Sequence, residues 1–364
     1  DGVGGYGMEM AMEQRLKGAP GMAIMQRTGR AKLFSSPHFP VQAAQNGDDL
    51  VLTIDARYQR IAEKELQKTV WHYDATGGSV VILDPISGDI LAISSEPGFD
   101  PNEYGDYGNY AWKLAAITDQ FEPGSTFKPA VLAAMFDTGF KTEDQVVFCE
   151  NSRWQVMGET ISDTKSFGNL SARDVLVFSS NIGMAKMAKD FDKYKMHDYA
   201  VKFGFGKKSG IELLGEINGT LSMPRKWVPF SQLAFSYGHE IAVTPLQMAG
   251  MYATIANNGF YSSPRIVKGI FRDEQPVGFD QKRHKRSVIK PETSRLMRDI
   301  MLDVVERGTG ENARIENMQV CGKTGTAHMV KSGGGYAAHR YISSFGGFFP
   351  KERPQLVIYV MIKE

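Results

Sequence analysis

A serine and a lysine in this sequence have the spacing of a nucleophile and its base. They lie in the segment Glu122-Pro123-Gly124-Ser125-Thr126-Phe127-Lys128. Proline and glycine interrupt the chain just before Ser125, so we expect this serine at the N-terminus of a helix. Residues i and i+3 share a helix face, which brings the amine of Lys128 within reach of the hydroxyl. Because free N–H groups and the helix dipole also favour developing negative charge there, the pair suits acyl transfer through serine.

Two further Ser-x-x-Lys patterns occur, Ser162-Asp163-Thr164-Lys165 and Ser287-Val288-Ile289-Lys290. Neither pattern follows a Pro-Gly break that opens a helix. The helix that starts at Pro291 begins only after Lys290. Taken alone, the pattern at Ser125 is weak, because a serine at such a position can equally be an ordinary helix cap. Its interpretation therefore depends on the residues that join it.

Two more segments could complete such a site. Ser179-Ser180-Asn181 is the only Ser-x-Asn in the sequence, between two short predicted helices, although helix capping would be the better explanation of this segment taken alone. Lys323-Thr324-Gly325-Thr326 lies in a predicted strand, where alternation places Lys323 and Gly325 on one face and the threonines on the other. Glycine in a strand lets a ligand approach the backbone closely. Lys331-Ser332-Gly333 is a rival in a glycine-rich stretch that reads as a loop.

Sheet-forming and helix-forming segments are distributed unevenly around these motifs. Strands are predicted over 50–54, 77–83 and 90–95, and again over 320–330, 341–349 and 356–362, with a helix over 55–70. The middle is helical, with starts at Ser171, Ile182, Thr244-Pro245 and Pro291. Since sheet pieces stand at both ends of a helical block, we expect one sheet assembled from distant segments, an α+β fold.

Composition narrows the class of protein. The 364 residues are 42% hydrophobic and 23% charged, which is typical of a folded domain. The net charge of +1 gives no electrostatic case for a nucleic-acid partner. Cys149 and Cys321 are better read as buried hydrophobic residues than as a disulfide, and no cofactor or zinc site is indicated. No apolar run reaches the ~20 residues that cross a bilayer, so the protein is soluble or its anchor lies upstream.

The order Ser-x-x-Lys, Ser-x-Asn, Lys-Thr-Gly resembles the transpeptidase domain of the class B penicillin-binding proteins. The resemblance extends from about Asp49 to the end, and its Glu-Pro-Gly-Ser and Ser-Ser-Asn-Ile-Gly variants are similar to the cell-division subgroup. Residues 1–48 resemble the remnant of that class's N-terminal pedestal, and 49–364 its penicillin-binding domain. The matching segments are Gly78–Asp84, Gly88–Ala92, Glu122–Pro129, Thr244–Gln247 and Ala256–Gly259.

The resemblance implies a central antiparallel sheet flanked by helices and a peptidoglycan D,D-transpeptidase that β-lactams inhibit. It implies that Ser125 is the nucleophile, Lys128 its base, Ser179 a proton relay and Lys323 a second cation, while Asn181, Thr324, Gly325 and Thr326 hold the substrate. The implied partners are stem peptides ending in D-Ala-D-Ala, β-lactams, a membrane glycosyltransferase and divisome proteins. The implied location is the periplasmic face of the membrane, with a single N-terminal anchor outside this sequence.

Two alternatives share the fold. A serine β-lactamase carries the same motifs but needs a base for hydrolysis, and Glu212 and Glu216 follow Asn181 at suitable distances. We read both glutamates as structural, and the 144 positions between Ser179 and Lys323 (323 − 179) exceed what a compact β-lactamase needs. A non-catalytic β-lactam sensor or divisome scaffold is the other alternative.

Overall fold

The computed structural model describes residues 3–35, 39–278, 285–330 and 336–364. These residues form two compact units. The first unit draws on residues 1–53, 212–214 and 266–282, and the second on 54–211, 215–265 and 283–364. Residues 49–53, which the sequence assigned to the start of the larger domain, thus belong to the smaller unit, and the boundary after residue 48 stays a prediction.

The first unit is built from short elements with little core. Its three-stranded sheet has the order β16-β15-β5. The Asp48 carboxylate accepts from the guanidinium groups of Arg272 (2.6 Å) and Arg15 (3.4 Å), which fixes the chain before β5. The elements are α1 (Gly7–Ala11), α2 (Glu13–Leu16), β1 (Met22–Ala23), β2 (Met25–Arg27), β3 (Leu33–Ser35), β4 (Val41–Gln42), β5 (Asp49–Leu52), β15 (Val267–Arg272) and β16 (Gln275–Val277).

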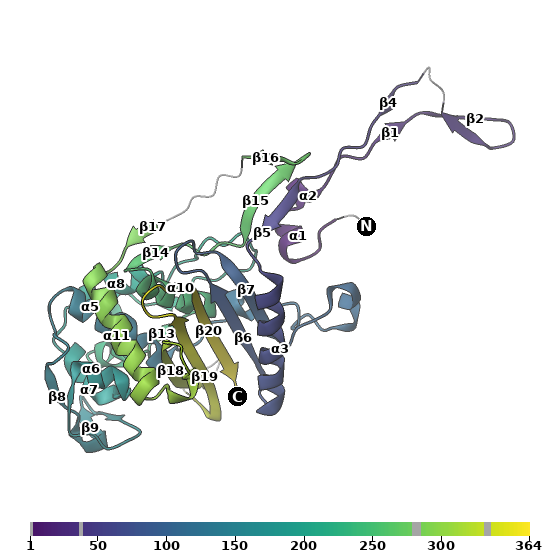
Figure 1. Cartoon of the computed structure of the whole chain (residues 1–364). Helices are drawn as coiled ribbons and strands as arrows, with labels where there is room; N and C mark the ends of the chain where they lie inside the picture. Colours follow the sequence, from purple (N-terminus) through teal and green to yellow (C-terminus); the bar gives the residue numbers. More distant parts are fainter. Residues whose placement is uncertain (1–2, 36–38, 279–284, 331–335) are drawn as a thin grey trace. The chain divides into compact units, whose positions relative to one another are not determined.

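The second unit contains a five-stranded antiparallel sheet assembled from both ends of its sequence (Figure 1). The order is β18-β19-β20-β6-β7, so β18 and β7 form its two edges. This arrangement confirms the predicted α+β fold, because the central pair joins β20 near the C-terminus to β6 near the start of the unit. The strands are β6 (Gly77–Leu83), β7 (Ile90–Glu96), β18 (Cys321–Val330), β19 (Tyr336–Phe349) and β20 (Leu356–Lys363).

Helices cover both faces of this sheet. On one face α3 (Ala56–His72) buries Ala62, Leu66 and Val70 against alternate strand residues that include Val80 and Ile82. On the other face Tyr359 meets Tyr252 of α10 (Pro245–Ala256), a helix whose residues are all buried. Period-two alternation along β20 places Tyr359 opposite the side that faces α3. The sheet is therefore the middle layer of a three-layer unit.

Most of the remaining helices form a block beside β18, whereas α4 packs against β6, β7 and α10. Helix α11 (Pro291–Arg307) packs against that strand and against α5 and α6. Helix α8 was not predicted, and α7 begins at Asn181 itself, one residue earlier than expected. The other helices are α4 (Ala115–Thr118), α5 (Lys128–Asp137), α6 (Ala172–Val177), α7 (Asn181–Ala188), α8 (Lys193–Phe203) and α9 (Ser231–Ser236), with 3₁₀ turns η1 (Pro101–Asp106), η2 (Gly124–Phe127), η3 (Glu150–Ser152), η4 (Pro224–Lys226) and η5 (Glu311–Ala313).

Short strand pairs complete the second unit. The hairpin of β9 (Arg153–Val156) and β10 (Glu159–Ser162) is separated from the Ser-x-Asn segment in sequence by β11 and α6. It contacts that segment in space through Ser162 and Asp163. The other pairs join β8 (Val146–Phe148) to β11 (Asn169–Ser171), β12 (Thr220–Leu221) to β13 (Ile241–Ala242), and β14 (Phe260–Ser262) to β17 (Lys285–Ser287). Within the described ranges, no helix combines the length and the apolar character needed to cross a membrane.

Several local predictions are confirmed by the caps that the structure contains. Asp55 caps α3 by accepting from Arg57 N (2.9 Å), and Ser171 caps α6 by accepting from Asp174 N (3.1 Å). Thr244 and Gln247 form a reciprocal capping box at the start of α10. Both cysteines are buried and free, as expected. Side-chain caps of this kind are encoded within four residues, which is why the sequence predicts them well.

Candidate active site

Ser125 lies in the turn η2, immediately before α5. The sequence predicted an α-helix start here, whereas the structure has a 3₁₀ turn over Gly124–Phe127, and α5 begins at Lys128. Ser125 is partly exposed, while Thr126, Phe127 and Lys128 are fully buried. The turn therefore presents the serine side chain to solvent and anchors its neighbours in the core.

A close contact between two glycines shapes this turn. Gly124 has φ of +52°, a conformation that favours glycine, and its N–H donates to Gly238 O (3.0 Å). A Cβ on Gly238 would lie 2.1 Å from Gly124 O, so only glycine fits there. The Pro-Gly break in the sequence is thus held by the segment Tyr237-Gly238-His239, and the adjacent His239 ring bonds Glu122 (3.0 Å).

The ammonium group of Lys128 lies at the centre of a hydrogen-bond network with the Ser-x-Asn segment. Lys128 Nζ donates to Ser179 O (2.6 Å), Asn181 Oδ1 (2.8 Å) and Ser179 Oγ (3.3 Å). The side chain has no exposed surface. The structure therefore brings the first and second predicted motifs together, although they are more than 50 residues apart, as the separation of Lys128 and Ser179 shows.

Burial lowers the pKa of Lys128 well below its usual value, and the nearby charge of Lys323 lowers it further. The carboxylate of Asp163 opposes both effects by favouring the charged form. The Lys323 charge acts on Lys128, so the third predicted motif lies near the first two. A lysine whose pKa is depressed in this way can accept a proton at neutral pH.

The Ser-x-Asn segment is a sharp turn between α6 and α7. Ser179 has φ of +64°, which is unusual for a residue with a side chain. Ser180, the middle residue, is the cap of α7 and accepts from Gly183 N (2.8 Å). The capping interpretation is therefore correct for Ser180, whereas Ser179 and Asn181 contact Lys128.

Asp163 supports this turn from the end of the β9–β10 hairpin, and sequence reasoning missed it. Its two carboxylate oxygens accept from Ser180 Oγ (2.5 Å) and Asn181 N (2.5 Å). The neighbouring Ser162 O accepts from Asn181 Nδ2 (3.0 Å). The second Ser-x-x-Lys pattern thus contributes to the site as a support for Asn181. The only signal for Asp163 in the sequence was its place in the pattern Ser162-Asp163-Thr164-Lys165, which no predicted helix start accompanies.

Lys323 extends from β18 and is also fully buried. Burial lowers its pKa to about 7. Its Nζ donates to Thr324 O (2.9 Å) and Thr309 Oγ1 (3.2 Å), and Thr324 Oγ1 donates to the same Thr309 hydroxyl (3.1 Å). Thr309 lies in the Gly-Thr-Gly turn after α11, and sequence analysis assigned it no role in the site.

The Lys-Thr-Gly segment packs directly against the serine turn. A Cβ on Gly325 would lie 2.9 Å from Thr126 Cγ2 and 3.1 Å from Thr126 N, so glycine is required for this contact. The sequence predicts that a ligand approaches Gly325, whereas its neighbour in the structure is Thr126, next to Ser125 in the turn. Thr324 is half-buried and Thr326 exposed, which leaves their hydroxyls accessible beside the turn.

Two buried tyrosines contact the serine turn through Thr126. Tyr252 OH donates to Thr126 O (3.0 Å), and Tyr359 OH lies 3.2 Å from Thr126 Oγ1. Both rings come from the layer between α10 and the sheet, and burial raises the pKa of Tyr359 to about 12. Both hydroxyls therefore stay protonated at neutral pH. Tyr252 needs its proton in order to donate to Thr126 O.

The rival candidates have other partners. Lys290, of the third Ser-x-x-Lys pattern, binds Asp137 at the far end of α5 through its backbone N (2.6 Å) and its Nζ (3.0 Å). Glu216 accepts from the backbone and hydroxyl of Ser209 (2.6 Å each), and Glu212 accepts from Ile266 N (2.9 Å). Both glutamates therefore bind backbone N–H groups, which supports their structural interpretation. The rival Lys331-Ser332-Gly333 lies outside the described residues.

Comparison with known proteins agrees with this geometry. Residues 78–364 match the family model of the penicillin binding protein transpeptidase domain. The chain is 32% identical over 366 residues to a probable peptidoglycan D,D-transpeptidase, PenA, of Neisseria gonorrhoeae, and 31% identical over 365 residues to the peptidoglycan D,D-transpeptidase FtsI of Escherichia coli strain K12. All of this chain is covered, but it spans only 61% and 60% of those relatives.

Solved structures extend the likeness to three dimensions. Penicillin binding protein 3 of Mycobacterium tuberculosis, complexed with ampicillin, has a TM-score of 0.89 and 28% identity, covering 100% of this chain and 79% of that one. The transpeptidase domain of penicillin-binding protein 3 from Burkholderia pseudomallei has a TM-score of 0.76 and 29% identity, covering 86% and 88%. The predicted resemblance to the class B proteins is confirmed, and the chain belongs to the penicillin-binding protein transpeptidase family.

Proposed function

We propose that this chain is the transpeptidase part of a peptidoglycan D,D-transpeptidase that works through an acyl-serine intermediate on Ser125. The substrate is a stem peptide that ends in D-Ala-D-Ala. Ser125 Oγ attacks the carbonyl carbon of the penultimate D-Ala, an ester bond forms, and the peptide bond to the terminal D-Ala breaks. An amine from a neighbouring stem peptide then attacks the ester, a new amide forms, and the Ser125 hydroxyl is restored.

Lys128 takes the proton from Ser125 as the attack begins. Its depressed pKa supports this role, because a lysine near ~10.4 would hold its proton at neutral pH. Ser179 Oγ, 3.3 Å from Lys128 Nζ, passes a proton to the nitrogen of the departing D-Ala. When the acceptor amine attacks, its proton returns by the same route to Ser125.

The remaining residues bind and polarise the substrate. Asn181 holds the peptide amide, and the hydroxyls of Thr324 and Thr326 bind the terminal carboxylate beside Lys323. The N–H groups of Ser125 and Thr326 form the oxyanion hole, in which one donor contributes roughly 3–4 kcal/mol in comparable enzymes. The packing of Gly325 against Thr126 supports this assignment, because it holds the strand that carries Thr326 against the serine turn.

One observation carries the proposal. A fully buried lysine, one helical turn from an accessible serine, is hydrogen-bonded to both functional positions of the Ser-x-Asn segment. Burying an ammonium group costs free energy. Buried lysines with a depressed pKa therefore occur mainly at functional sites, where the shifted pKa serves proton transfer. A purely structural capping role for these motifs would not require a buried lysine.

Intact-mass spectrometry after exposure to benzylpenicillin tests the proposal. We expect one covalent adduct, mapped to the peptide that contains Ser125, and loss of the adduct in Ser125→Ala, by a factor of roughly 10⁴ or more in rate. Ser287→Ala, in the rival pattern bound to Asp137, is the matched control and retains the adduct. An adduct on Ser125→Ala at the normal rate would refute the assignment.

Turnover separates the alternatives on the same fold. A transpeptidase gives one slow burst with nitrocefin and transfers the acyl group of a D-Ala-D-Ala peptide to an added amine. Steady nitrocefin hydrolysis would favour a β-lactamase, a reaction for which Glu212 and Glu216 are poorly suited because both bind backbone N–H groups. Labelling without transfer would favour a sensor or scaffold.

We also propose the biological setting that the resemblance to the cell-division subgroup implies. Residues 49–364 serve as the transpeptidase domain and residues 1–48 as the end of a pedestal. The protein acts at the periplasmic face of the membrane in septal wall synthesis, with a membrane glycosyltransferase and divisome proteins as partners. Depletion of the protein should produce filaments, whereas rounded cells would assign it to elongation.

A further inference from the structure

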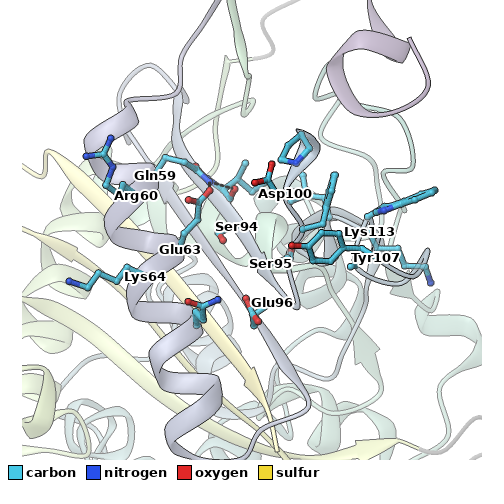
Figure 2. Close-up of a pocket in the computed structure, with 18 residues that line it drawn as sticks. Gln59, Arg60, Glu63, Lys64, Ser94, Ser95, Glu96, Asp100, Tyr107 and Lys113 are labelled. Carbon is cyan, nitrogen blue, oxygen red and sulfur yellow. Dashed lines mark hydrogen bonds between the residues drawn. The ribbon is translucent and has the colours of Figure 1, made fainter. Parts of the chain in front are cut away.

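A groove of about 910 Å³ lies beside β7, the sheet edge opposite β18. Figure 2 shows its three sides: Gln59 and Glu63 from α3, the segment with Asp100, Tyr107 and Lys113, and Ser94 to Glu96 of β7 between them. Its volume is at the upper end of the ~300–1,000 Å³ that is usual for ligand sites. None of its lining residues belongs to the three motifs of the candidate active site.

An added peptide strand does not fit this groove. Gln59 already occupies the edge of β7, accepting from Ile93 N (2.9 Å) and donating to Ile93 O (3.0 Å). Main-chain groups on an antiparallel edge face outward at every second residue. Leu91 O already accepts from Asp55 N (2.9 Å) and β7 ends at Glu96, so along the groove Ser95 is the position left for pairing. Strand addition depends on several consecutive main-chain bonds. An extended peptide is therefore a poor occupant.

The charges that line the groove cancel. Arg60, Lys64 and Lys113 are the cations, and Glu63, Glu96 and Asp100 are the anions. Sites for phosphate or nucleic acid carry an excess of basic side chains, which this groove lacks. Balanced charges with amide and hydroxyl groups instead suit a neutral ligand that is rich in hydrogen-bonding groups.

Aromatic rings form one wall and are held in place by one another. Tyr107 stands edge-to-face with Phe99 (6.3 Å between ring centroids), and Trp112 with Tyr104 (6.2 Å). Phe99, Tyr107 and Trp112 line the groove. Such rings offer flat apolar surfaces with a polar edge, and their fixed positions reduce the entropy lost on binding. Flat apolar faces beside planar polar groups match the faces and hydroxyls of a sugar ring.

We propose that this groove binds a neutral saccharide chain built from N-acetylated amino sugars. The general saccharide assignment rests on the lining alone. The choice of amino sugars rests on the proposed function, because the stem peptides of peptidoglycan are carried on such a chain. The groove would then hold the glycan of a strand independently of the chemistry at Ser125.

Isothermal titration of the 364-residue chain with the hexamer of N-acetylglucosamine tests this proposal. We expect binding that Tyr107→Ala weakens roughly tenfold by removing the ring. Tyr107→Phe, which keeps the ring, should retain it. Tyr110→Ala is the matched control from the same segment, since Tyr110 is exposed and does not line the groove. Thermal unfolding shows that each variant is folded.

Three outcomes would overturn the proposal: no binding of the hexamer, equal affinity in wild type and Tyr107→Ala, or binding of a D-Ala-D-Ala pentapeptide in the groove instead. Equal affinity for cellohexaose, which lacks acetamido groups, would overturn the amino-sugar assignment. Penicillin labelling of the wild-type chain is measured in parallel. Hexamer binding without a Ser125 adduct would refute the acyl-transfer proposal alone, and the reverse result would refute the groove alone.

Discussion

Charged side chains have opposite environments at the two edges of the central sheet. At the β18 edge, Lys128 and Lys323 are fully buried and their pKa values are lowered. At the β7 edge, Arg60 and Lys113 are exposed beside an open groove with balanced charges. Both edges belong to one sheet, so the difference comes from what covers each strand.

The covering elements explain this contrast. At β18, the turn η2 packs so closely that Gly325 must be glycine, and water is excluded from the two lysines. At β7, α3 contacts the strand through Gln59, and the rest of the edge opens into the groove. Where water is excluded, the charged form of a side chain is destabilised and its pKa shifts, which suits proton transfer. At an open edge, charged side chains stay hydrated, which suits reversible binding.

The largest expected effect comes from removing the amine at the buried edge. Lys128→Met should slow acylation by penicillin by roughly 10²–10⁴-fold, because the general base is lost. In the wild type, the acylation rate should rise with pH and level off well below pH ~10.4, since the pKa of Lys128 is lowered. Stopped-flow acylation across pH measures both.

Lys68→Met is the matched control for this substitution. Lys68 is an exposed lysine of α3 that pairs with Glu65 and lines neither site. Its acylation profile should equal that of the wild type. A wild-type rate that climbs only near pH ~10.4 would remove Lys128 from the role of base.

The second lysine offers a test on stability. Burial holds the folded pKa of Lys323 at about 7, whereas an unfolded lysine has ~10.4. Between these values the unfolded state binds a proton that the folded state lacks, so this group makes the free energy of unfolding rise with pH across that window. Below about pH 7 the full cost of burial is present.

Lys323→Met should therefore raise the free energy of unfolding by about 1–3 kcal/mol at pH 6, and by less at pH 10, while it abolishes acyl transfer. Urea denaturation at the two pH values measures the difference. Loss of the contacts to Thr309 and Thr324 opposes the gain. A variant that is less stable at pH 6 than the wild type would show that those contacts outweigh the buried charge.

A smaller effect is expected at Asp163. Asp163→Asn keeps the shape but removes the charge that raises the pKa of Lys128, so that pKa should fall and the acylation profile should move to lower pH. The maximal rate should drop roughly tenfold. Both carboxylate oxygens of Asp163 accept hydrogen bonds, whereas the amide of an asparagine has only one oxygen that can accept. A shift to higher pH would contradict this electrostatic argument.

The smallest effect is expected at the open edge. Partial burial raises the pKa of Glu96, so the folded state keeps a proton that the unfolded state has lost. This group's contribution to stability is present below the unfolded pKa of ~4.3 and is lost as pH rises through the folded pKa. Glu96→Gln should raise the melting temperature by roughly 1 °C or less at pH 7 and not at pH 3. An equal gain at both pH values would rule out this charge effect.

Local signals predicted much of the fold. The cap and proline at Thr244-Pro245 set the start of α10, and Pro291 set the start of α11. Ser125, Ser179 and Lys323 could be proposed because each lies in a short pattern with a recognisable chemical purpose. Asp163 and Thr309 could not, because each acts through a partner 14 to 18 residues away, and no pattern marks that distance.

Sequence alone determined which side chains were available, where the capped helices α3, α6 and α10 begin, and which three segments could share a site. The tertiary structure alone decided that Lys128 and Lys323 lose water, that Asp163 holds Asn181, and that β7 faces a groove. The reason is physical: caps and periodicity act within a few residues of chain, whereas a pKa or a cavity depends on every atom that surrounds a group.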